Sequence, residues 1–398
     1  MKKIISSISI LCSLLVVLLS CADSKTEMQK TIEKGLDRAT IASLEMAKSL
    51  EGNKLLPKTF ENGQLVTSDS KWWCSGFFPG VLWYLYENNP TDELKKYAID
   101  YTNRVEDQKY TTDNHDIGFM IYCSFGNGLR ILGTDSYNDV IVQASKSLST
   151  RYKDHIGVIR SWDWNTDVWQ YPVIIDNMMN LEMLMWASEY TGDTIYADIA
   201  KSHADKTMKE HFREDYSCFH VVDYDTITGN SRLKQTWQGY SDTSSWARGQ
   251  AWALYGYSMM YRETGDDKYL NQAERIADFI IHHPNMPKDG IPYWDFNAPN
   301  IPDEKRDASA AAVMASAFIE LSQQTKDNKL SELYLNTAGK QLITLTSDEY
   351  LAEPGTNGNF ILKHSVGAIP RDQEIDVPLT YADYYYVEAL MRYKKLEL

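Results

Sequence analysis

Two aspartates stand out as candidate acids and bases, because each lies in or beside an apolar segment. Asp116 follows His115 and comes directly before the apolar run 117–120 (IGFM). Asp176 lies inside the apolar run 172–181 (PVIIDNMMNL) and has no basic neighbour in sequence. Loss of hydration raises the pKa of a carboxyl group, so we expect Asp176 to hold a proton near neutral pH, as a general acid must. The alternative is a core aspartate that bonds a backbone group or caps a helix.

Asp116 has a different sequence environment. An acid immediately before an apolar helical run is typical of a helix N-cap, whose side chain accepts backbone N–H groups. A carboxylate is stabilised at that end of a helix, which predicts a charged Asp116 in an electrostatic or substrate-positioning role. Two acids whose surroundings push their pKa values apart are the expected sign of divided acid and base roles.

Arg248 and Trp252 form a second candidate pair, in the segment 244–252 (SSWARGQAW). They are four residues apart, so on a helix they share a face. Arginine can offer two parallel N–H groups to a carboxylate, and tryptophan can offer a flat wall for a sugar ring. The pair predicts a site for a uronic acid, unless Arg248 is paired with an aspartate of the protein and its stem packs on Trp252.

Three aromatic and polar clusters precede predicted helices, at 72–80 (WWCSGFFPG), 160–164 (RSWDW) and 237–240 (WQGY). Binding residues are often carried by loops that a rigid scaffold positions. The chain holds 11 Trp and 26 Tyr. Most such rings pack in cores, but their amphipathic character also suits the faces of sugars.

The sequence gives no sign of a metal, a cofactor or a nucleic-acid partner. The eight histidines show no HExxH or related ligand spacing, and neither a phosphate-binding loop nor a dinucleotide fingerprint is present. No Ser-His-Asp signature is evident either. The formal net charge of −15 disfavours a surface that binds DNA or RNA, because nucleic acids bind positively charged surfaces. We therefore expect none of these three.

The N-terminus reads as an export signal. Lys2 and Lys3 precede an apolar run that ends at Leu18-Leu19-Ser20-Cys21, the pattern of a bacterial lipobox. We expect residues 1–20 to be a lipoprotein signal peptide, Cys21 to carry lipid, and residues 21–30 to form a tether. The protein would then be an exported lipoprotein, in the periplasm or on the outer membrane. An ordinary signal peptide or a short membrane anchor is the alternative.

Helical periodicity dominates the rest of the chain. The predicted helices are 30–50, 76–88, 92–108, 117–132, 137–152, 173–190, 194–210, 247–264, 267–283, 307–324, 328–346 and 379–396. A short hairpin arm is predicted at 219–222.

A weak internal repeat suggests how these helices are arranged. Gly192 and Gly265 each stand between a threonine and an aspartate, and Gly133 begins a looser copy. We expect each glycine to end one helix in a left-handed cap and the following aspartate to open the next. Repeated helical hairpins predict an all-α fold, a closed (α/α)6 barrel of six hairpins formed by residues 31–398 as one domain. An open solenoid is the alternative.

Taken together, these segments resemble the unsaturated glucuronyl hydrolases of glycoside hydrolase family 88. The matching stretches, from Trp72 to the C-terminus, are WWCSGFFPG (72–80), HDIGF (115–119), RSWDW (160–164), DNMMNLEML (176–184), SSWARGQAWALYG (244–256), YWDF (293–296), RDASAAA (306–312) and EIDVPLTYADYYYVEAL (374–390). The resemblance implies an (α/α)6 barrel without a metal. It also implies a substrate class, short oligosaccharides that lyases leave with a Δ4,5-unsaturated uronic acid at the non-reducing end, with glycosaminoglycan fragments expected first.

The resemblance also implies roles for individual residues. Asp176 falls on the general acid/base, and Asp116 on the second essential aspartate. The implied substrate contacts are Trp73, His115, Trp162, His220, Gln238, Arg248 and Trp252. The implied reaction is hydration of the C4=C5 vinyl-ether bond, in which a proton reaches C4 and water adds at C5. We further expect Arg248 to face the uronate carboxylate.

Three other functions fit parts of the pattern. An unsaturated rhamnogalacturonyl hydrolase acting on pectin fragments would share the fold and the aspartates. A non-catalytic glycan-binding lipoprotein would keep the aromatic clusters but need no acid in an apolar setting. A sugar epimerase on the same barrel would use histidine bases, for which His115 and His220 are candidates.

Overall fold

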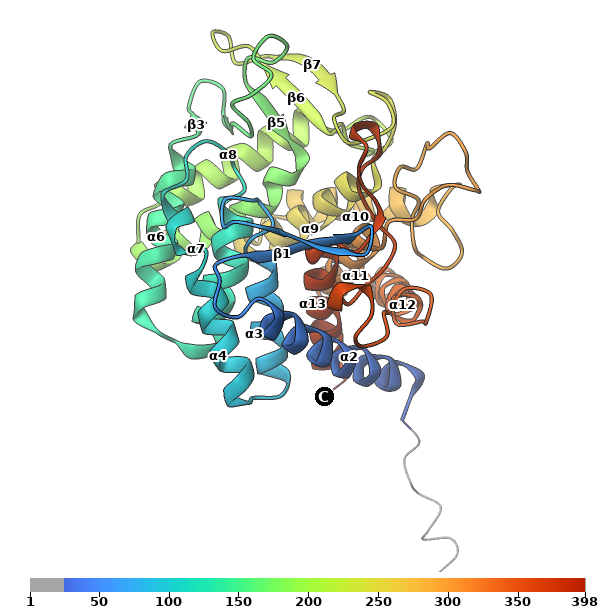
Figure 1. Ribbon diagram of the computed structural model, residues 1–398. Coiled ribbons are helices and arrows are strands. Elements are labelled where there is room, and N and C mark those ends of the chain that lie inside the picture. Colours follow the sequence, from blue (N-terminus) through green and yellow to red (C-terminus); the bar gives the residue numbers. More distant parts are fainter. Residues whose placement is uncertain (1–24, 398) are drawn as a thin grey trace, which may run out of the picture.

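A computed structural model describes residues 25–397 of the chain (Figure 1). The predicted signal peptide and Cys21 lie outside the described residues. The α-helices are α2 (Glu27–Ser49), α3 (Phe77–Asn88), α4 (Asp92–Asn103), α5 (Asn127–Leu132), α6 (Asp135–Ser149), α7 (Leu181–Thr191), α8 (Ile195–Glu210), α9 (Ala247–Thr264), α10 (Asp267–His282), α11 (Ala308–Gln324), α12 (Asn328–Leu345) and α13 (Thr380–Leu396). Short helical segments are η1 (Glu106–Tyr110), the π-helical η2 (Gly118–Gly126), η3 (Ile175–Asn180), η4 (Asn357–Asn359) and η5 (Ile369–Arg371).

Two kinds of helix are distinguished by their buried faces. In α10 the buried residues recur at three- and four-residue spacing, as in the series Tyr269, Ala273, Ile276 and Ile280. One apolar stripe is typical of a helix on the outside of a protein. By contrast, α9, α11 and α13 are buried on all sides over most of their length, which places them in the interior.

The interior elements follow one another around the molecule. In the order α3, η2, α7, α9, α11, α13, each packs against the next, and α13 packs against α3. Each also packs against an outer helix: α4, α6, α8, α10, α12 and α2, respectively. The helical predictions are therefore confirmed for every segment, although several boundaries differ.

The largest boundary error concerns residues 173–180. They form strand β5 (Pro172–Ile174) and the 3-10 segment η3 before α7 begins. A short run rich in β-branched residues fits a buried strand as well as a helix, and β5 pairs with β6 (Val221–Tyr224), which pairs with β7 (Ser231–Gln235). The hairpin arm predicted at 219–222 is confirmed by β6.

The remaining strands were not predicted. They form antiparallel pairs: β1 (Leu56–Glu61) with β2 (Gln64–Ser68), β3 (Tyr152–Lys153) with β4 (Val158–Ile159), and β8 (Ser365–Ala368) with β9 (Gln373–Val377). In Figure 1 the β5–β7 sheet lies at one end of the helical body, and the N-terminal end of α2 lies toward the other.

The predicted glycine caps are confirmed. Gly133, Gly192 and Gly265 each end a helix with a positive φ, of 63°, 74° and 66°. The aspartate prediction holds at Asp266, whose side chain accepts the N–H of Lys268 at the start of α10. It also holds at Asp193, whose side chain accepts the N–H of Ile195 at the start of α8, although Thr194 is in the N-cap position. At the start of α6 the N-cap residue is Thr134, whose side chain makes no capping hydrogen bond.

Residues 27–30 of the predicted tether are helical. Thr26 and Gln29 form a reciprocal capping box, with each side chain accepting the other's backbone N–H. The helix α2 therefore begins at Glu27, and residues 27–30 belong to it. Within residues 25–397, no helix combines the length and the hydropathy that a membrane span requires.

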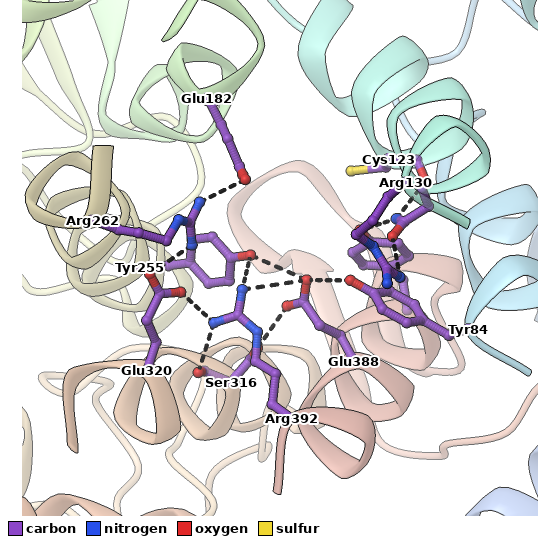
Figure 2. A network of polar contacts seen from close by, with 12 residues as sticks. Tyr84, Cys123, Arg130, Glu182, Tyr255, Arg262, Ser316, Glu320, Glu388 and Arg392 are labelled. Atoms are coloured by element: carbon purple, nitrogen blue, oxygen red, sulfur yellow. Dashed lines mark hydrogen bonds and ion pairs between the residues drawn. The ribbon is translucent and has the colours of Figure 1, made fainter. Parts of the chain in front are cut away.

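Charged and aromatic side chains fill the end of the interior that is opposite to the β5–β7 sheet (Figure 2). Glu388 accepts hydrogen bonds from the hydroxyls of Tyr84, Tyr255 and Ser316. Arg262 pairs with Glu182, Glu263 and Glu320, and Arg392 also reaches Glu320. A cavity of about 530 Å³ lies among these side chains. This group, the floor network, joins α7, α9, α11 and α13.

Candidate active site

The predicted site residues gather where the interior elements begin. Trp73 precedes α3, Asp116 precedes η2, Asp176 lies in η3, and Arg248 lies in the first turn of α9. Each interior helix is preceded by a loop, and these loops end at the same side of the molecule. Residues far apart in the sequence are thereby brought to one place.

Asp176 has the environment that the sequence predicts. Burial is the main cause that raises its pKa to about 7, while the charge of Arg248 and the indole N–H of Trp252 oppose the shift. The indole nitrogen and Asp176 Oδ2 do not reach hydrogen-bond geometry, and neither atom has another partner in the described structure. Asp176 is therefore partly protonated at neutral pH, so it can donate a proton there.

The prediction of a charged Asp116 is wrong. Its backbone carbonyl accepts the N–H of Met120, but its side chain accepts no backbone N–H. Burial and the neighbouring charge of Asp176 raise its pKa to about 8, against the opposing charge of Arg151. Asp116 lies at the helix start, as the sequence predicts, but its burial disfavours the charged form more than the helix start stabilises it.

Each aspartate has a histidine beside it. His115 Nε2 lies 3.3 Å from Asp116 Oδ1, and His220 Nε2 lies 3.7 Å from Asp176 Oδ2. Both rings are buried. Burial is the main cause that lowers the pKa of His115 to about 3 and the pKa of His220 well below its ordinary value. Both histidines are neutral at neutral pH.

The Arg248 guanidinium is bound by the protein itself, which is the alternative that the sequence left open. Its Nη1 lies 3.0 Å from Asp307 Oδ2 and also donates to the carbonyl of Val366, and its Nη2 donates to the carbonyl of Gly367 at 2.7 Å. Both fork positions are therefore occupied by the protein. Only Nε is left without a partner among the described residues. Arg248 acts on the site through its charge, which opposes the raised pKa of Asp176.

Trp252 does not offer a stacking wall either. Its ring is fully buried and packs 5.3 Å from the rings of both Phe119 and Tyr385. Trp252 contributes its indole N–H, on the side of Asp176. Trp73 is half-buried and packs on Tyr381, with 5.0 Å between the ring centroids.

The other predicted contacts lie on the side of His220. Trp162 stands 6.0 Å from the His220 ring and stacks on the exposed Trp164 at 4.7 Å. Gln238 donates its backbone N–H to His220 Nδ1 and its side-chain amide to Gly367 O. All nine predicted residues thus belong to one connected region.

Sequence reasoning missed three members of this region. Asp307 caps α11 and pairs with Arg248; an acid before the small-residue run 308–312 is the signal that marks it. Tyr381 lies 5.1 Å beneath the Arg248 guanidinium, and Arg371 stacks on Trp237 at 3.2 Å. No sequence signal connects these last two pairs, because their members lie more than 130 residues apart.

The two carboxyl groups and their neutral neighbours can transfer protons to and from a bound molecule. Two carboxyl groups with raised pKa values lose their protons in successive steps, so near neutral pH the pair can hold both an acid and a base. The neutral histidines and the indole are N–H donors around them.

Known proteins are similar to this chain over most of its length. It is 52% identical over 330 residues to the unsaturated glucuronyl hydrolase of Formosa agariphila, covering 83% of this chain and 82% of that protein. The crystal structure of an unsaturated glucuronyl hydrolase specific for heparin matches with a TM-score of 0.89 and 46% identity, over 92% of this chain and 98% of that one. No family model matches the chain.

A bound substrate is seen in a more distant structure. A variant of the unsaturated glucuronyl hydrolase of Streptococcus agalactiae, complexed with dGlcA-GalNAc6S, matches with a TM-score of 0.77 and 27% identity, over 93% of each chain.

Proposed function

Because the chain belongs to the unsaturated glucuronyl hydrolases, and is therefore a glycoside hydrolase, we propose that it removes the Δ4,5-unsaturated uronic acid from the non-reducing end of glycosaminoglycan fragments left by lyases. The relatives support this substrate class, since one solved structure is specific for heparin and another holds dGlcA-GalNAc6S. The observation that carries the proposal is the pair of buried carboxyl groups, Asp116 and Asp176, with raised pKa values.

The reaction is a hydration. Asp176 gives its proton to C4 of the unsaturated ring, and positive charge develops at C5 and the ring oxygen. Water then adds its oxygen to C5 while a carboxylate takes the proton that water loses. The resulting hemiketal opens by breaking the bond between C5 and the ring oxygen, which leaves a ketone at C5 and a hemiacetal at C1. The hemiacetal then breaks its bond to the glycosidic oxygen and releases the remaining sugar and a keto-uronate. The two carboxyl groups titrate as a coupled pair, and in the singly protonated state with the proton on Asp176, Asp116 is the carboxylate that stabilises the positive charge.

The fold that carries this chemistry is an (α/α)6 barrel formed by residues 31–398 as one domain. Two observations support it: the closed order of the interior elements, each with an outer helix, and the match to the solved hydrolases. The starts of the interior elements form the catalytic end of the barrel.

The enzyme is also an exported lipoprotein, anchored by lipid on Cys21 after removal of residues 1–20. The lipobox supports this proposal. Metabolic labelling with a fatty acid should mark the parent protein and leave Cys21→Ser unlabelled; equal labelling of the two would contradict it.

A substrate panel tests the proposed activity. Unsaturated disaccharides from chondroitin, heparin and pectin absorb ultraviolet light through the double bond, and hydration removes that absorbance. We expect loss of absorbance with the chondroitin or heparin fragments. Loss of absorbance with the pectin fragment alone would show that the substrates are pectin fragments and not glycosaminoglycan fragments. Binding of all three without loss would make the protein a glycan-binding module.

A further inference from the structure

The ring of His220 is held by the backbone on one side. The N–H groups of Trp237 and Gln238 both donate to Nδ1, at 3.0 and 3.2 Å. A ring nitrogen that accepts two hydrogen bonds carries no proton, so in the neutral ring the proton is on Nε2. That atom lies 3.7 Å from Asp176 Oδ2, and neither of the two has another hydrogen-bond partner in residues 25–397.

The ring of His115 is held in an equivalent way, through a hydroxyl. The N–H of Ile174 donates to Ser161 Oγ at 2.9 Å, so the Ser161 hydroxyl is free to donate its own hydrogen. Among residues 25–397 the one neighbour in place to accept that hydrogen is His115 Nδ1, at 3.3 Å, so we assign Nδ1 as the acceptor. The His115 proton is therefore on Nε2 as well, 3.3 Å from Asp116 Oδ1.

Asn177 supports this assignment. Its side-chain nitrogen donates to the carbonyl of Ile159 at 2.9 Å. Its oxygen is buried without a partner in the described part of the chain, and the same side chain lies beside His115. The free oxygen of Asn177 is an acceptor beside His115, and His115 Nε2 has no other donor or acceptor bonded to it in residues 25–397, so an Nε2–H ring fits this side better than a bare nitrogen does.

We propose that His115 and His220 are positioning residues, each locked as the Nε2–H tautomer so that it presents one N–H to its own aspartate. Asp176 then uses Oδ2 for His220 and keeps Oδ1 to carry and transfer the proton. The role given to the aspartates rests on the proposed function, whereas the locked tautomers do not.

The surrounding charges keep both rings neutral. His220 faces Arg248, His211 and His115, and all three disfavour a second proton on it. Arg151 does the same for His115. Burial is the larger cause in both cases. A locked neutral ring is the same N–H donor on both sides of neutral pH, so the aspartate is the group that titrates.

Nitrogen NMR of the purified full-length protein tests the tautomers without any assay of activity. Ring ¹⁵N shifts and two-bond couplings distinguish a neutral Nε2–H ring from an Nδ1–H ring and from a charged ring. We expect His115 and His220 to be neutral Nε2–H rings from pH 5 to pH 8. In Ser161→Ala, His115 should lose that preference while His220 keeps it. An Nδ1–H or charged ring in the parent protein would overturn the proposal.

Two matched variants test the positioning role. In His220→Asn, the amide oxygen can still accept the N–H groups of Trp237 and Gln238, but no donor reaches Asp176. In His220→Gln, the amide nitrogen can replace the Nε2 donor. A donor favours the carboxylate form, so its loss raises the pKa of Asp176. We expect the alkaline limb of kcat/KM to move up by about one pH unit in His220→Asn and to stay in place in His220→Gln.

The outcomes separate the two proposals. A rise in KM with an unmoved alkaline limb in both variants would mean that His220 only contacts substrate, and would overturn its positioning role. If NMR shows the locked tautomers but the protein leaves every unsaturated disaccharide intact, the proposed function is wrong and the tautomer proposal stands. Because the NMR measurement uses the parent protein, it decides the tautomers even where a variant does not fold.

Discussion

Arg248 and Asp307 form an ion pair that is almost completely withdrawn from water, with side-chain exposures of 1% and 0%. The pair joins the starts of α9 and α11. Asp307 also accepts the hydroxyl of Ser309 and caps α11 with its side chain. A buried pair of this kind is strongly destabilising when one partner is removed, because the other charge remains buried.

We therefore predict that Arg248→Met lowers the free energy of unfolding by about 3–5 kcal/mol, as measured by urea denaturation. The matched control is Lys96→Met, which removes a cation from the exposed pair with Glu51 and should leave the free energy of unfolding almost unchanged, because solvent screens an exposed ion pair. If Arg248→Met were as mild as the control, the guanidinium would be free for a substrate carboxylate after all.

This pair also shows where the sequence stops being informative. The spacing of Arg248 and Trp252 correctly predicts a shared helix face. It does not reveal that Val366 and Gly367 of strand β8 lie against the guanidinium, since that contact depends on how segments distant in the sequence pack. The structural pairing that the sequence left open as an alternative is the one that forms.

Helices were predictable because two local signals agree: apolar periodicity and left-handed glycines at positions such as Gly192 and Gly265. Strand β5 was not, because an apolar run alone does not distinguish a buried strand from a helix. For Asp116 the position at a helix start was predictable, but the direction of its side chain was not. Its pKa follows from that direction and from Asp176, which lies in another element.

Asp176 supplies the proton in the proposed hydration. Asp176→Asn keeps the shape and polarity of the side chain but has no acidic proton, so we predict at least a 1,000-fold loss of kcat, on the order expected for a group that transfers a proton in the transition state. The unsaturated disaccharide should still bind, which equilibrium binding measurements can show. Turnover within tenfold of the parent protein would remove Asp176 from the role of acid.

Asp116 should weaken the fold at alkaline pH. An acid whose pKa is raised in the folded state binds its proton more tightly there than in the unfolded chain. Its contribution is therefore most favourable at low pH and is lost as the pH rises from its ordinary pKa of 3.8 to about 8. Asp116→Asn has no such loss, so we predict that it raises the free energy of unfolding at pH 8 by about 1–3 kcal/mol.

The gain in Asp116→Asn should grow between pH 4 and pH 8, as followed by thermal unfolding across that range. Asp113→Asn is the control, because Asp113 is a neighbouring aspartate with an exposed side chain, and it should give no such trend. A variant less stable than the parent protein at pH 8 would contradict the assignment of a desolvated carboxyl group.

The floor network should serve stability rather than chemistry. Glu388 accepts three hydroxyl groups and lies 3.6 Å from Arg392, at the end of the interior away from Asp176. Glu388→Gln forces one of its hydroxyl partners to turn and leaves Arg392 with less countercharge. We predict a loss of about 1–3 kcal/mol of stability with kcat/KM unchanged below the melting range. Glu45→Gln, at an exposed pair, should change neither. A purely structural network affects activity only by changing the fraction of protein that is folded. A fall in kcat/KM comparable to that of Asp176→Asn would therefore show that the floor network takes part in the reaction.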